Sequence, residues 1–109
     1  MVNSMNSKLV GVTMGDEGRQ ANVKSLTKGQ EIFILRESNN PFDPNAMKLF
    51  ADPQLTKPLG YIKKELARDL AEQRAKGWSY KFFCEEVTGK ETQSFGCNIR
   101  IEATNENPN

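Results

Sequence analysis

Residues 37–49, with the sequence ESNNPFDPNAMKL, connect two apolar runs and decide how the middle of the chain folds. The run EIFILRE (31–37) precedes the connection and AMKLFA (46–51) follows it, which predicts two neighbouring strands. A two-residue turn is enough to join such strands. The connection here is longer and places two prolines around one aromatic residue, which indicates an ordered loop.

The prolines restrict this loop at more positions than their own. Each proline fixes its own φ and pushes the preceding residue into extended geometry, so Asn40 and Asp43 are restricted as well. An ordered loop loses less entropy when it binds a ligand. Two interpretations remain open. Phe42 folds back to plug one end of a barrel while Asp43 caps backbone amides, or Phe42 is a stacking platform and Asp43 accepts a hydrogen bond from a ligand hydroxyl.

Strand patterns recur at short spacing on both sides of the loop. The expected strands are residues 8–14, 31–37, 46–51, 59–63, 78–89 and 95–103. Residues 64–76 have the periodicity of an amphipathic helix, and Gly77 is placed to end it. A slip in alternation predicts a bulge near Phe82 and Phe83. We therefore expect a mainly β fold, a small antiparallel OB-like or SH3-like barrel of about six strands with one helix packed on it.

The length and charge of the chain limit its organisation. The 109 residues suit one domain, which we place at residues 8–103, between a disordered N-terminal tail at 1–7 and a C-terminal tail at 104–109. The net charge of +1 gives no general attraction to nucleic acid or membranes, so such a partner needs a local basic patch. There is neither a membrane-length apolar run nor a signal-peptide pattern, which predicts a cytoplasmic location without membrane association.

The composition also argues against an enzyme. The chain has no histidine, which removes the commonest general base and zinc ligand. Cys84 and Cys97 are its only cysteines, and we expect buried free thiols, with a disulfide between paired strands as the alternative. Asp43 and the other candidate carboxylates come with no recognisable catalytic partners. We therefore predict a binding module that uses no metal and no cofactor.

Basic residues supply the local patch that binding to nucleic acid requires. Lys57, Lys63 and Lys64 cluster around the fourth expected strand and the helix start, where free backbone amides and ammonium groups can meet a phosphate. Simple solvation of these lysines is the alternative. Tyr61 offers a ring or a hydroxyl, or is half-buried structure. Arg19 either pairs with an adjacent acidic side chain or reaches a phosphate.

Two segments together carry a resemblance to a known family. NNPFDPNAMKLF (39–50) followed by LGYIKKELARDLA (59–71) resembles the HIRAN domain family, and VGVTMGDEGRQANV (10–23) is similar to the opening of its bacterial members. The resemblance covers residues 8–103 and implies an OB-like β-barrel that carries a helix. In helicase-fused relatives such a domain grips the 3′ end of single-stranded DNA.

The resemblance also implies roles for individual residues. The loop aromatic, here Phe42, stacks on a terminal base, and the following Asp43 bonds the free 3′ hydroxyl. The other implied positions at the bound strand end are Asn40, Tyr61, Lys64 as a phosphate ligand, and Phe95. Thr13 and Met14 stand where helicase-fused relatives carry an Arg-aromatic pair. Part of the stacking clamp is therefore missing or rebuilt in this chain.

We thus expect a single-stranded DNA-binding module that recognises free 3′ ends in DNA repair or replication-fork processing. The candidate DNA-binding residues are Arg19, Asn40, Phe42, Asp43, Tyr61, Lys63, Lys64 and Phe95. The alternative is a protein–protein interaction module that recruits a helicase, a nuclease or another DNA-processing partner supplied as a separate chain.

Overall fold

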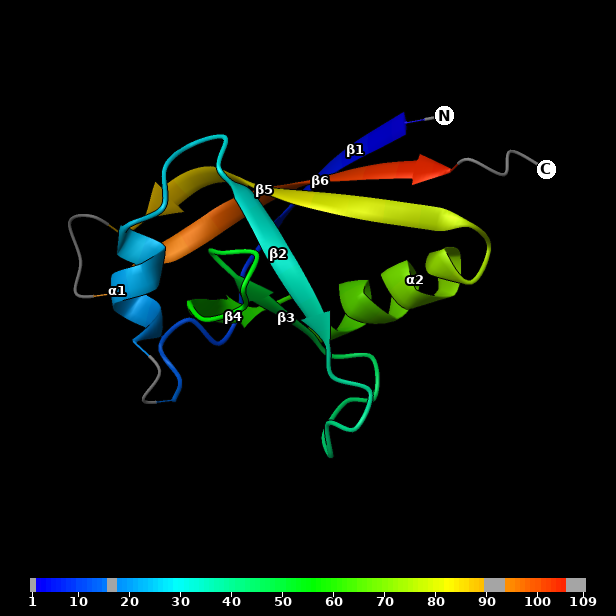
Figure 1. The fold of residues 1–109 in the computed structure, drawn as a ribbon, viewed down its shortest axis with the longest axis horizontal. Coiled ribbons are helices and arrows are strands. Elements are labelled where there is room, and N and C mark those ends of the chain that lie inside the picture. The colour runs from blue at the N-terminus through cyan, green and yellow to red at the C-terminus, as the bar shows by residue number, and fades with distance from the viewer. Residues whose placement is uncertain (1, 16–17, 90–93, 106–109) are drawn as a thin grey trace.

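A computed structural model describes residues 2–15, 18–89 and 94–105, and within these ranges the chain forms six strands and two helices. The elements are β1 (Val2–Lys8), α1 (Arg19–Lys24), β2 (Glu31–Arg36), β3 (Met47–Phe50), β4 (Pro58–Tyr61), α2 (Lys64–Arg74), β5 (Trp78–Thr88) and β6 (Gly96–Asn105). The strands pair antiparallel in the order β1-β6-β5-β2-β3-β4. They curl into a half-barrel, with α1 and α2 toward opposite ends (Figure 1). The mainly β prediction is confirmed.

Two local features produce the curl. β5 and β6 pair along most of their length, but β2 pairs with β5 only at Glu31 and Ile32 before the two strands diverge. The register of β5 shifts between Cys84 and Glu86, two residues after the predicted position near Phe82 and Phe83. A bulge adds one residue to its strand and increases the local twist, so it bends β5 at this point.

The core lies on the concave side of the sheet, and β6 contributes to it as predicted. Cys97, Ile99, Ile101 and Ala103 are all buried, while the residues between them are only half-buried. Phe82 and Cys84 face them from β5. Every second residue of these paired strands points to one face, so their apolar alternation places this set in the interior.

The predicted strand at residues 8–14 was wrong in position. β1 covers Val2–Lys8, which we had expected to be part of a tail, and it pairs with β6 over that whole range. A polar sequence can form this strand because an edge strand is held by its backbone hydrogen bonds to the neighbouring strand. After β1 the chain turns toward β4, where Val10 and Tyr61 form an isolated bridge. At the other terminus β6 extends to Asn105, and the rest of the expected C-terminal tail lies outside the described residues.

The observed helices agree in part with those predicted from the sequence. α2 begins at Lys64 as predicted and ends at Arg74, followed by Gly77 with a φ of 97°. The sequence predicted one helix, but the structure contains a second, α1, which is six residues long. Val23 of α1 is buried against the core. Neither helix in the described part of the chain is long and apolar enough to cross a membrane.

The two cysteines are free and buried, which confirms the prediction of free thiols. Their sulfur atoms lie 3.6 Å apart across β5 and β6. Burial raises the pKa of both thiols, and for Cys97 the neighbouring Cys84 raises it further. The thiolate is the reactive form of cysteine, so this pair belongs to the core and not to a reactive site.

Candidate nucleic-acid interface

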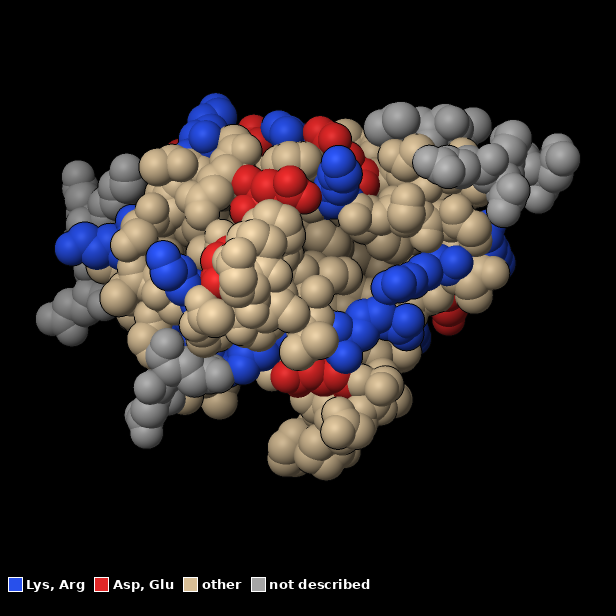
Figure 2. Space-filling model, viewed as in Figure 1, with Lys and Arg blue, Asp and Glu red and all other residues tan. Residues whose placement is uncertain are grey.

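The loop between β2 and β3, residues 37–46, projects from the body of the half-barrel. Phe42 is 88% exposed at this loop, the most exposed of the large apolar side chains in the described residues. Figure 2 shows the loop as a protrusion at the lower edge of the molecule, with acidic side chains beside its base. The interpretation of Phe42 as a barrel plug was wrong. Its ring contributes little to the core, and it is presented to solvent.

Hydrogen bonds within the loop hold Phe42 in this exposed position. The side-chain oxygen of Asn40 accepts from the backbone amides of Phe42 at 2.9 Å and Asp43 at 3.1 Å. One carboxylate oxygen of Asp43 accepts from the amide of Asn45 at 2.9 Å. These are the local bonds that Asn and Asp make in turns, and together with the two prolines they order the loop before any ligand arrives.

Glu37 connects the base of the loop to β4, and sequence reasoning missed it as a site residue. The same carboxylate oxygen of Glu37 accepts two hydrogen bonds, one from the Tyr61 hydroxyl at 2.8 Å and one from the side-chain amide of Asn40 at 3.1 Å. The Glu37 backbone amide also donates to the carbonyl of Ala46. One side chain therefore fixes the relative positions of Tyr61 and the loop. An acidic residue at the end of a strand gave no sequence signal for this role.

A pocket of about 690 Å³ lies beside the loop, and we call it the end pocket. Its lining residues are Val10, Gly11, Met14, Gly15, Arg19, Asn40, Phe42, Asp43, Ala46, Tyr61, Ile62 and Lys64. Six of the eight predicted site residues are among them. The fold thus brings together an exposed ring, a carboxylate, a half-buried tyrosine and two cations from segments that are distant in sequence.

The segment after β1 forms the opposite wall of the end pocket. Val10 and Tyr61 exchange backbone hydrogen bonds of 2.9 and 2.8 Å, which places Gly11 next to the tyrosine ring. The Arg19 guanidinium donates to the Gly11 carbonyl at 2.7 Å and lies 5.5 Å from the centre of the Tyr61 ring. Met14 lines the same pocket and is 65% exposed. This wall depends on a bridge between residues far apart in the chain, so the sequence pattern did not reveal it.

Lys63 and Phe95 do not line the end pocket. Lys63 is exposed at the N-cap of α2, next to Lys64, which does line it. Phe95 is half-buried against the core, and its backbone amide and carbonyl bond the side chain of Gln20. Gln20 also donates to the carbonyl of Val12. Phe95 is thus connected to the Val10–Met14 wall through Gln20.

The end pocket combines positive and negative groups. Arg19 and Lys64 supply the positive charge, and Lys48 lies 5.9 Å from the centre of the Tyr61 ring. Asp43 supplies the negative charge. Among the described residues no three side chains of the metal-binding types gather closely enough to hold a metal ion. The site can therefore offer stacking, hydrogen bonding and ion pairing to a ligand.

The structure is thus a small β half-barrel with a pocket beside a hydrogen-bonded loop. The HIRAN domain family model matches residues 2–104, nearly the whole chain. The chain therefore belongs to the HIRAN domain family, which confirms the resemblance found in its sequence. No curated protein sequence matches the chain.

Two solved structures have a similar fold. The HIRAN domain of human HLTF superposes with a TM-score of 0.65 at 22% identity, covering 94% of this chain and 77% of the other. A protein from Lactobacillus plantarum superposes with a TM-score of 0.67 at 20% identity, covering 95% of this chain and 98% of the other. At these identities the likeness concerns the fold.

Proposed function

We propose that the end pocket binds the free 3′ end of single-stranded DNA. The observation that carries this proposal is the 88% exposure of Phe42 on a braced loop beside a carboxylate and two cations. An exposed ring gives a face on which a base stacks, and cations beside it attract the phosphate backbone. Membership of the HIRAN family supports the same ligand class, because the family motif implies DNA binding.

Each group in the pocket has a distinct task in this proposal. Phe42 stacks on the terminal base, with Met14 as a second apolar surface in place of the Arg-aromatic pair. One Asp43 oxygen accepts from the Asn45 amide, and the other accepts a hydrogen bond from the 3′ hydroxyl. Lys64 and the free amides at the start of α2 bind the last phosphate.

The remaining predicted residues position or support these contacts. Asn40 shapes the loop, and Tyr61 forms the floor of the pocket through its bond to Glu37. Arg19 holds the opposite wall through Gly11, and Phe95 acts on that wall through Gln20. Lys63 lies outside the pocket and meets the strand as it leaves. A strand end held in this way is presented to a helicase or nuclease acting in DNA repair or at a replication fork.

Discrimination between two chemical ends tests the role of Asp43. A 3′ phosphate replaces the hydroxyl donor with negative charge, so we expect the wild type to bind a 12-nucleotide strand with a 3′ hydroxyl roughly 10- to 150-fold more tightly, as for a hydrogen bond to a charged group. Asp43→Asn retains an oxygen for Asn45 but removes the charge, so its preference should fall to a few-fold. Fluorescence anisotropy measures both. Equal wild-type affinity for the two ends would exclude this role.

A further inference from the structure

A second pocket lies where β2 and β5 diverge. The two strands pair only at Glu31 and Ile32, so the rest of β2 pairs with β3 alone and leaves an opening toward α2. The opening forms a pocket of about 480 Å³, which we call the arginine pocket. Its lining residues are Ile34, Leu35, Arg36, Arg74, Ser79 and Tyr80.

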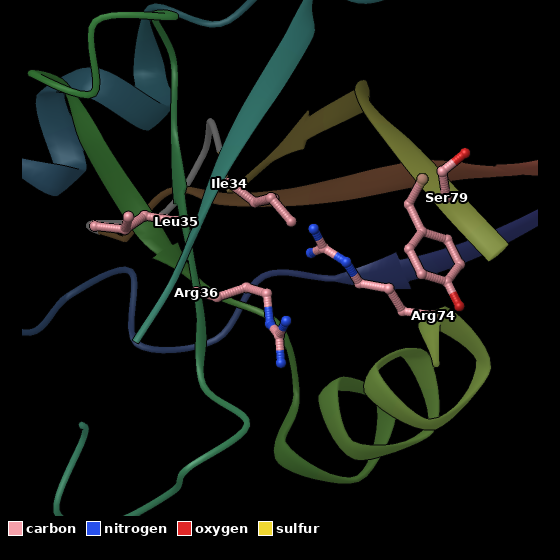
Figure 3. A pocket seen from close by; sticks show the side chains of 6 residues that line it. Ile34, Leu35, Arg36, Arg74 and Ser79 are labelled. Atoms are coloured by element: carbon pink, nitrogen blue, oxygen red, sulfur yellow. The ribbon is translucent and has the colours of Figure 1, made fainter. Parts of the chain in front are cut away.

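Two guanidinium groups enter the arginine pocket from different elements. In Figure 3 the side chain of Arg36 points from β2 into the gap toward α2, and that of Arg74 reaches from the end of α2 back toward β2. Both side chains are exposed. Within the described part of the chain, neither forms a hydrogen bond or an ion pair. Like charges that face one gap repel each other, so an anion between them is favoured.

A hydrogen bond between β5 and α2 braces the wall behind the arginines. The Tyr80 hydroxyl donates to the carbonyl of Leu70 at 3.0 Å and so ties β5 to α2. Burial raises the pKa of Tyr80, and the positive charge of Arg74, which lines the same pocket, acts in the opposite direction. A cation in the last turn of a helix also stabilises the helix dipole. That role accounts for Arg74 but leaves Arg36 unexplained.

The arginine pocket and the end pocket are connected by two elements. Arg36 precedes Glu37, whose side chain holds Tyr61 in the end pocket. α2 begins at Lys64 in the end pocket and ends at Arg74 in the arginine pocket, a distance of about 15 Å at the rise of an α-helix. That distance corresponds to about four stacked nucleotides. Figure 2 shows Lys and Arg side chains in a band over α2 on this face.

We infer that the arginine pocket binds an internal phosphate of the single strand whose 3′ terminus occupies the end pocket. The inference rests on the proposed function and extends it to nucleotides about four positions before the end. Guanidinium forks match the geometry of phosphate oxygens, and the open gap gives a strand access from solvent.

A length comparison tests the inference. The probes are a trinucleotide and a 12-nucleotide strand, both with a 3′ hydroxyl, and the protein is the Arg36→Gln/Arg74→Gln double variant. Each lost phosphate contact on a single strand lowers affinity about fivefold at 0.1 M salt and flattens the salt slope by about 0.7. Because the two arginines hold one phosphate, we expect affinity for the 12-nucleotide strand to fall roughly fivefold, the slope to decrease by about 0.7, and trinucleotide affinity to stay unchanged.

Matched controls separate this inference from its alternatives. Arg68→Gln removes the same charge from α2, where Arg68 faces Asp69 at 3.7 Å outside the pocket, and should leave both affinities near wild type. Equal binding of the 12-nucleotide strand by the double variant and wild type would overturn the inference. The inference would also be overturned if binding of a 12-residue acidic peptide, but not of DNA, required both arginines, because this result indicates a protein partner. If 3′-phosphate and 3′-hydroxyl strands bind the wild type equally while the double variant still weakens both, end recognition fails and the internal phosphate site stands.

Discussion

Phe42→Ala is expected to reduce affinity for a single strand with a 3′ hydroxyl roughly 5- to 150-fold, because one stacked base contributes about 1–3 kcal/mol. The ring is 88% exposed, so its removal should leave the thermal unfolding temperature nearly unchanged. Anisotropy titrations and thermal melts of the same samples measure the two effects separately.

Two further substitutions at the same position identify the interaction. Phe42→Trp keeps an aromatic face and should bind at least as well as wild type, whereas Phe42→Leu keeps the apolar volume but lacks the face and should resemble Phe42→Ala. If Leu serves as well as Phe, general apolar contact explains binding and the stacking role is wrong. A loss of stability in Phe42→Ala would show that the ring has a structural task.

Gly60→Ala is expected to unfold or strongly destabilise the half-barrel and to remove the end pocket with it. A methyl group at this position would lie 2.5 Å from the backbone oxygen of Val10 and 3.2 Å from a methyl of Val12. Val10 must then move and lose its bridge to Tyr61. Overpacking together with the two lost backbone bonds costs roughly 3 kcal/mol, a decrease of about 15 °C in Tm.

Gly29→Ala is the control for this effect. Gly29 has a φ of 87° and open space around its Cα, so alanine there is strained by its backbone and not by a collision. It should cost about 1 kcal/mol and leave DNA affinity unchanged, because Gly29 lies outside the end pocket. If Gly60→Ala melts no lower than Gly29→Ala and binds DNA normally, the contact between Gly60 and Val10 does not maintain the pocket.

The elements with strong local signals were predictable from the sequence. The alternation in β6, the periodicity of α2 and the proline-braced loop each have a direct local cause, and the structure contains all three. The exposure of Phe42 was open to two interpretations, because a ring between two prolines suits a plug and a platform equally. Packing against the rest of the molecule decides between them.

Features that depend on distant partners were not predictable. β1 has a polar sequence and becomes a strand only because the edge of β6 is available to it. α1 is too short to be stable alone and forms because Val23 is buried. The Glu37 bond to Tyr61 and the approach of Arg36 and Arg74 join segments that carry no mutual signal in the sequence.

The end pocket as the receptor for a strand terminus is tested most directly by NMR titration of the ¹⁵N-labelled protein with a short single strand. With a free 3′ hydroxyl, we expect the largest amide shift changes at Gly11, Phe42, Asp43, Tyr61 and Lys64, and we expect them to be much weaker with a 3′ phosphate. Shift changes that cluster on another face, or that are identical for the two ends, would contradict the account.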